Sequence, residues 1–250
     1  MRSENHIVHG LWIGKELSAL QLLTLKSFLQ NGHEFHLWLY EPVLTPLPKG
    51  TVVRDATQVL ARDSVFCYEE ACCSLSRKDS PDREFGKGSF AGFSDIFRYR
   101  LLYLEGGWWS DMDVTCLRAL DFSEPYVFRD HGIHGVVGNI MKCPKKSPLM
   151  HRCYQRTIRE VTSLNTDWSK PIRILATCIH ELGLSNFIKE GISNDDVLTE
   201  IEPFLVKDTP VPGSYYVIHW CNEALRFRGL SEAFFKSNST FGRLLQTFAV

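Results

Sequence analysis

The sequence predicts an α/β fold with a central mixed, mostly parallel sheet flanked by helices. Residues 7–13 have the apolar character of a strand, and residues 35–40 form a second such segment. Between them, Leu17, Leu20 and Phe28 recur at helical spacing. A strand, a helix and a strand in this order are typical of a parallel α/β unit.

Glycine, asparagine and proline mark the ends of these elements. Gly14 ends the first strand, Asn31-Gly32 is a stop signal for the helix, and three prolines between 42 and 48 mark the loop after the second strand. The later elements follow from the same kinds of pattern. We expect short helices and loops over 52–80, and a helix over 90–105 ended by Gly106-Gly107. Strands are expected over 126–128 and 136–141, and helices over 147–162 and 171–190. The last predicted element is a strand over 215–220, followed by a polar tail.

Length and composition limit the organisation of the chain and the class of partner. A chain of 250 residues can bury a sizeable core. We expect one domain over 1–250, with helical insertions around 55–90 and 145–190. The formal net charge is −1, which argues against a nucleic-acid partner, because a phosphate-binding surface brings excess Lys and Arg.

The chain also lacks the patterns of export and membrane insertion. Residues 1–9 are polar and have no apolar core of a signal peptide. No run of about 18 apolar residues is present, so we expect no transmembrane segment. The eight cysteines include no Cys-x-x-Cys pair, and we interpret them as mostly reduced core residues. We therefore expect a cytoplasmic protein, at most peripheral at the inner face of a membrane.

The helix expected over 90–105 combines an apolar face with a polar stripe. At about 100° per residue, one face collects Phe93, Phe97, Leu101 and Leu104, which we expect to be buried. The neighbouring stripe carries Ser94, Asp95 and Arg98. These three side chains either hold a polar ligand at the edge of the core or form a solvated Asp–Arg pair at three-residue spacing.

Two aspartates follow this helix, Asp111 and Asp113. In an extended segment, side chains two residues apart point the same way. Two carboxylates on one side repel each other unless a cation or a proton lies between them. A divalent metal suits such a pair, because hard cations take several oxygen ligands. The alternative is a pair of turn aspartates on the surface, since an isolated Asp-x-Asp is common.

The combined pattern over residues 90–115 is Ser-Asp-x-x-Arg, then Gly-Gly, an aromatic residue and Asp-x-Asp. It resembles the sugar-binding region of the glycosyltransferases that carry the Asp-x-Asp motif. That group includes bacterial polysaccharide transferases, yeast mannosyltransferases, animal α1,4-galactosyl- and N-acetylglucosaminyltransferases and, more distantly, clostridial glucosylating toxins. The resemblance implies a GT-A-type nucleotide-sugar-binding fold and a retaining enzyme. Such an enzyme moves a sugar from a UDP-sugar to a glycan, a lipid-linked glycan or a protein, with Mn²⁺ or Mg²⁺ as cofactor.

The resemblance also implies roles for individual residues. Asp113, Asp111 and His219 would hold the metal, although a buried structural role for His219 stays open. Asp95, Arg98 and Asp111 would act in catalysis. Trp12 would stack on uracil, and Trp220 would form part of the pocket wall. The full set expected to bind the donor is Trp12, Phe90, Ser94, Asp95, Arg98, Trp109, Asp111, Asn139 and Trp220.

Two other functions remain open from the sequence. Residues 111–115 have the form Asp-x-Asp-x-Thr, which resembles the nucleophile motif of haloacid-dehalogenase-type phosphatases. Asn194-Asp195-Asp196 could mimic the distal acidic motif of that family. The helix with Ser94, Asp95 and Arg98 would then be unexplained. The third possibility is a non-catalytic module that binds sugar nucleotides without turning them over.

Overall fold

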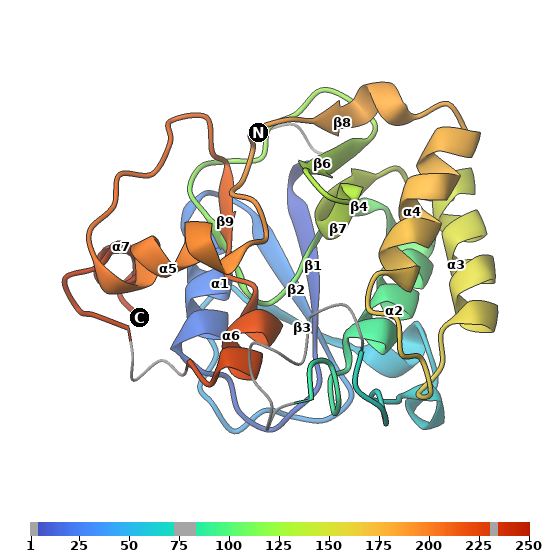
Figure 1. Ribbon diagram of the computed structural model, residues 1–250, viewed down its shortest axis with the longest axis horizontal. Coiled ribbons are helices and arrows are strands. Elements are labelled where there is room, and N and C mark those ends of the chain that lie inside the picture. The colour runs from blue at the N-terminus through green and yellow to red at the C-terminus, as the bar shows by residue number, and fades with distance from the viewer. Residues whose placement is uncertain (1–4, 73–83, 231–234) are drawn as a thin grey trace. The chain divides into compact units, whose positions relative to one another are not determined.

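The computed structural model describes residues 5–72, 84–230 and 235–250 (Figure 1). It has the α/β class of fold that the sequence predicts, with sheet strands flanked by helices. The chain forms two compact units. The first contains residues 1–54, 110–123 and 190–250, and the second contains residues 55–109 and 124–189. A single domain with two helical insertions stays a prediction.

In the first unit, strands β3 (Val52–Asp55), β2 (Glu34–Leu39) and β1 (Ile7–Trp12) lie in this order. Strands β1 and β2 are parallel and in register from Ile7 opposite Glu34 to Trp12 opposite Leu39. Helix α1 (Ala19–Gln30) connects them. It begins with a capping box, in which Ser18 and Gln21 satisfy each other's backbone N–H groups. The predicted strand–helix–strand unit is confirmed.

The described residues of the first unit also form a two-stranded antiparallel ribbon and three helices besides α1. The ribbon pairs β5 (Val114–Cys116) with β9 (Val217–His219). The helices are α5 (Leu198–Val206), α6 (Asn222–Arg228) and α7 (Thr240–Thr247). They share one apolar core with α1 and β9, formed by Leu20, Leu23, Ile201, Phe204, Leu205, Ile218, Trp220, Leu225, Phe241, Leu244 and Phe248.

The second unit carries strands β4 (Gly107–Ser110), β7 (Gly135–Cys143), β6 (Val127–His131) and β8 (Ile188–Lys189), in this order. Strands β6 and β7 are antiparallel, and β6 and β8 are parallel. Helix α2 (Ala91–Glu105) packs on β7 and on α3 (Pro148–Glu160). Helix α4 (Lys170–Glu181) packs on α3 and on β7, so the three helices cover this part of the sheet (Figure 1).

Several elements differ from the sequence expectation. The polar tail expected after β9 is wrong, because α6 and α7 form there and α7 buries Phe241 and Leu244. Residues 52–55 form strand β3 rather than a helix or loop, and part of the 52–80 segment lies outside the described residues. The helix expected over 171–190 ends at Glu181, because Gly183 follows with a φ of +67° and breaks the helical path.

In the described ranges, no helix is long and apolar enough to cross a membrane.

Candidate functional site

The two aspartates of the Asp-x-Asp motif flank a firmly anchored residue, Met112. Residues 112–113 form a turn between β4 and β5, so the extended segment expected here is wrong. The Met112 carbonyl accepts a hydrogen bond from Thr24 Oγ1 at 3.0 Å. Its side chain packs on β1 at Gly10, where a Cβ atom would lie 2.9 Å from the Met112 sulfur. The turn can therefore hold Asp111 and Asp113 in a defined place without an extended backbone.

Strand pairing brings His219 to Asp113. In the β5–β9 ribbon, Val114 lies opposite His219, and the Trp220 N–H donates to the Asp113 carbonyl at 2.9 Å. The imidazole Nε2 lies 3.3 Å from Asp113 Oδ1. Asp113 Oδ2 accepts a hydrogen bond from the Asn222 N–H at 2.8 Å. Both carboxylate oxygens of Asp113 thus have partners within the first unit.

Asp111, Asp113 and His219 form a set of three candidate metal ligands. One ligand atom from each lies within 4.8 Å of the other two. The side chains of His219 and Asp113 keep 13% and 15% of their surface exposed, so a small ion can reach them. Two carboxylates and an imidazole are a mixed oxygen and nitrogen set, which suits Mn²⁺ better than Mg²⁺. These residues fit the divalent cation that the sequence resemblance implies.

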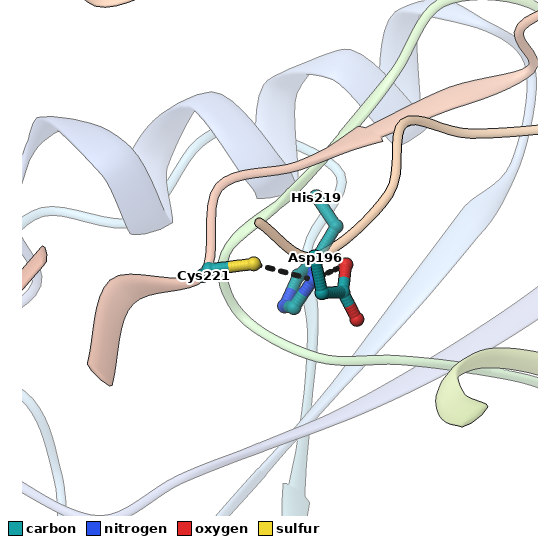
Figure 2. A group of neighbouring side chains, drawn as sticks. All are labelled: Asp196, His219 and Cys221. Atoms are coloured by element: carbon teal, nitrogen blue, oxygen red, sulfur yellow. Dashed lines mark hydrogen bonds and ion pairs between the residues drawn. The ribbon is translucent and has the colours of Figure 1, made fainter. Parts of the chain in front are cut away.

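Sequence reasoning missed two further side chains that surround His219 (Figure 2). Asp196 Oδ1 lies 2.7 Å from His219 Nδ1, and Cys221 Sγ lies 3.3 Å from the same nitrogen. Both groups therefore approach one edge of the imidazole. Together with His219 they are a second set that could hold a metal ion. In the sequence, Asp196 fits only a phosphatase-like acidic motif, and Cys221 is one of eight cysteines without a Cys-x-x-Cys pair.

The charges around His219 set its protonation when no cation is bound. Burial acts to lower the pKa of His219, but Cys221, Asp196 and Asp113 outweigh burial and hold that pKa well above its ordinary value. Burial acts to raise the pKa of Asp113, but His219 and the Asn222 N–H outweigh it, so this pKa is lowered. Without a cation, the imidazole is thus paired as a cation with carboxylates. Metal binding must release its proton.

Helix α2 places a second group of predicted residues in the second unit. Arg98 Nη1 lies 3.0 Å from Asp95 Oδ1, and the guanidinium carbon lies 5.1 Å from the centre of the Trp109 ring. Arg98 is 5% exposed and Asp95 is 9% exposed. The pair is therefore buried rather than solvated, and buried ion pairs persist only where their geometry is good. Ser94 is half-buried on the same helix.

Arg98 also reaches strand β7, where Asn139 lies. A Cβ atom at Gly138 would collide with the Arg98 guanidinium, so the glycine gives the side chain its room. Asn139 is the next residue and is buried. Phe90 immediately precedes α2 and is 37% exposed. Asp95, Arg98, Trp109 and Gly138 thus form one buried cluster in the second unit, with Asn139 beside it along β7.

Two of the three tryptophans expected at the donor, Trp12 and Trp220, lie in the first unit and have different surroundings. Trp12 ends β1, is half-buried, and donates its indole N–H to the Glu16 carbonyl at 3.0 Å. Trp220 is fully buried, and its indole N–H donates a hydrogen bond to Thr115 Oγ1 at 2.8 Å. Its ring lies edge-on to Phe241 in the apolar core. Trp220 therefore contributes to the apolar core, and its expected part in a pocket wall stays a prediction.

Comparison with known proteins gives a match to one family of sequences and likenesses to solved structures, including those of two transferases. Residues 75–129 match the family described as glycosyltransferase sugar-binding region containing DXD motif. No curated protein sequence matches the chain. A structure described as "PaToxG Glycosyltransferase" is 12% identical, with 71% of this chain and 68% of that chain covered and a TM-score of 0.45. A mutant transferase structure is 10% identical, with 90% and 91% covered and a TM-score of 0.42. The α/β architecture agrees with the GT-A-type fold that the sequence resemblance implies.

Proposed function

We propose that the chain is a metal-dependent, retaining glycosyltransferase that moves a sugar from a UDP-sugar to a glycan, a lipid-linked glycan or a protein. One observation carries the proposal: Asp111 and Asp113 converge with His219 within a chain whose residues 75–129 match a glycosyltransferase sugar-binding region. The sequence match supports glycosyl transfer as the class of activity. The three converging side chains support dependence on a divalent cation.

In this proposal, Asp111, Asp113 and His219 hold Mn²⁺ or Mg²⁺. The bound cation would neutralise negative charge that grows on the diphosphate as the bond to the sugar breaks. Asp113 is fixed for this task, because its two oxygens face His219 and the Asn222 N–H. Asp111 lies across Met112 from Asp113 and would also face the donor sugar.

Arg98 and Asp95 have the chemistry to serve the charged parts of the donor. A guanidinium fixed by a carboxylate and by the Trp109 ring is preorganised, so it can stabilise diphosphate charge without first reorganising. A carboxylate such as Asp95 suits the positive charge that develops on a sugar ring during transfer. Trp12, half-buried at the end of β1, offers an aromatic face for uracil.

The direct test is a thermal-shift panel of UDP-sugars with and without Mn²⁺, followed by an assay for release of UDP. A ligand at about 100 times its dissociation constant should add about 2.7 kcal/mol of stability. We expect a UDP-sugar to stabilise the protein in the presence of Mn²⁺, and slow hydrolysis of the donor in the absence of acceptor. The variant Asp195→Asn should respond to UDP-sugars and Mn²⁺ like the unmodified protein, since Asp195 is an exposed neighbour of the site.

This experiment and a phosphatase assay together separate the alternatives. Stabilisation by UDP-sugars without any turnover would identify a non-catalytic binding module. Hydrolysis of a chromogenic phosphate ester with Mg²⁺, without UDP-sugar binding, would identify a phosphatase. Either result would overturn the proposed transferase.

A further inference from the structure

The two ring nitrogens of His219 face different partners. Nε2 lies 3.3 Å from Asp113 Oδ1, on the side of the Asp-x-Asp motif. Nδ1 lies 2.7 Å from Asp196 Oδ1 (Figure 2). A neutral imidazole carries one proton and can bind a metal only through the other nitrogen. The position of that proton therefore decides whether His219 can bind a metal ion together with Asp111 and Asp113.

We propose that Asp196 is the positioning residue of this site: it keeps the His219 proton on Nδ1 and so leaves Nε2 to bind the divalent cation beside Asp111 and Asp113. The inference rests on the proposed metal-dependent function and deepens it. Metal-binding histidines commonly donate their second N–H to a carboxylate, which fixes the tautomer and the orientation of the ring. The Asp196–His219 distance fits such a charge-assisted hydrogen bond.

Cys221 is the competing partner for Nδ1, at 3.3 Å. The Asp196 carboxylate oxygen lies closer to the same nitrogen, at 2.7 Å. A thiol sulfur is a weak acceptor, whereas a carboxylate forms a short and strong hydrogen bond with an imidazole N–H. Asp196 is therefore the group that holds the Nδ1 proton.

The backbone fixes His219 in this orientation. Asn194 accepts a hydrogen bond from the His219 N–H at 2.9 Å and donates one to the His219 carbonyl, also at 2.9 Å. Asn194 and Asp196 belong to one short segment, so the same segment holds both the backbone and the ring of His219. After His219, Cys221 adopts a left-handed conformation with a φ of 50°. Non-glycine residues with this conformation concentrate at functional sites.

The left-handed turn has a definite effect on the site. It places the Asn222 N–H on Asp113 Oδ2 at 2.8 Å, while the Cys221 sulfur remains beside the imidazole. At the C-terminal end of β9, Asn222 thus orients Asp113, and the segment with Asn194 and Asp196 orients His219. Because Asp196 faces Nδ1 and Asp113 faces Nε2, we expect Asp196 to support the ring rather than to bind the same cation.

The test compares Asp196→Ala, Asp196→Asn and Asp195→Asn with the unmodified protein. Mn²⁺ affinity is measured by electron paramagnetic resonance of the unbound ion, and circular dichroism checks the fold. We expect Asp196→Ala to weaken Mn²⁺ binding by about 10- to 100-fold. Asp196→Asn should recover part of the loss, because the amide oxygen can still accept the Nδ1 hydrogen bond. Asp195→Asn should bind Mn²⁺ like the unmodified protein.

A second measurement does not depend on metal binding. In the metal-free protein at alkaline pH, where the imidazole is neutral, ¹⁵N NMR should show the proton of His219 on Nδ1. In Asp196→Ala the two tautomers should mix. If the unmodified protein binds no Mn²⁺, the proposed metal-dependent function fails, and the tautomer measurement still decides whether Asp196 orients the ring.

Two results would overturn the role of Asp196. The first is unchanged Mn²⁺ affinity and an unchanged tautomer in folded Asp196→Ala. The second is a thiolate-to-cobalt charge-transfer band with Co²⁺ that disappears in Cys221→Ser. That band would show that Cys221 binds the ion, which places the ion in the set of Asp196, His219 and Cys221, where Asp196 would be a ligand and not a support.

Discussion

Acidification should destabilise the protein through His33, which the fold holds in its neutral form. Burial lowers the pKa of His33 from 6.5 to about 4. The Leu120 N–H donates to His33 Nε2 at 3.1 Å, so Nε2 carries no proton. Nδ1 therefore holds the proton and donates it to the Asn5 carbonyl at 2.9 Å. Protonation of Nε2 would place its N–H against the Leu120 N–H and remove the hydrogen bond between His33 and Leu120.

The sign and size of the effect follow from the two pKa values. Above about pH 6.5, His33 is neutral in both the folded and the unfolded chain, and it adds no pH dependence. As the pH falls from about 6.5 towards about 4, only the unfolded chain takes up the proton, so the free energy of unfolding decreases. The loss is about 2 kcal/mol at about pH 5 and approaches about 3 kcal/mol below about pH 4.

The assay is urea unfolding of the unmodified protein and of His33→Gln at about pH 7.5 and about pH 5. Glutamine cannot titrate, so the variant should be less stable at the higher pH but should lose less on acidification. The stability gap between the two proteins should shrink by about 2 kcal/mol. A constant gap would refute the reasoning. So would ¹⁵N NMR of the unmodified protein that shows the other tautomer of His33, and this measurement holds even if the variant folds poorly.

The remaining predictions concern the site. Asp113→Ala should retain its circular dichroism spectrum but lose turnover by orders of magnitude, because a metal ligand is removed; near-normal activity would contradict the assignment. His219→Ala should lose the advantage of Mn²⁺ over Mg²⁺ in a metal titration of activity, and an unchanged preference would remove His219 from the metal set. Trp12→Ala should weaken donor binding by about 1–3 kcal/mol in isothermal titration, whereas Trp12→Phe should keep most of it. Gly10→Ala should reduce Mn²⁺ affinity by displacing Met112, whereas Gly213→Ala, which meets no atom within 4 Å, should not.

The elements that could be predicted from the sequence are those with a strong local pattern. Helix α2 and the β1–α1–β2 unit follow from periodic apolar residues and from glycine stop signals, and the structure confirms both. Helix α7 is not evident from the sequence, because polar residues surround Phe241, Leu244 and Phe248, although these three have helical spacing. Strand β3 is too short for a period of two to identify it.

The supports of the site could not be predicted, because they depend on contacts between distant parts of the chain. The Asn222 N–H and Asp113 are 109 residues apart, and His219 and Asp196 meet only through the segment that contains Asn194. In the sequence, Asp196 follows Asp195, and nothing in their spacing shows which of the two faces inward. The structure distinguishes the two residues, since Asp195 is exposed and Asp196 is half-buried.

The residue between the two aspartates gives a physical reason to regard this Asp-x-Asp as more than a surface turn. A solvated turn has no need for an apolar middle residue, yet Met112 is 6% exposed. Its carbonyl is bound by Thr24 and its side chain occupies the room that Gly10 leaves in β1. An anchored middle residue fixes the two flanking carboxylates, which raises the electrostatic cost of leaving them together without a counter-charge. The fold therefore maintains a negative site that His219 or a cation must neutralise.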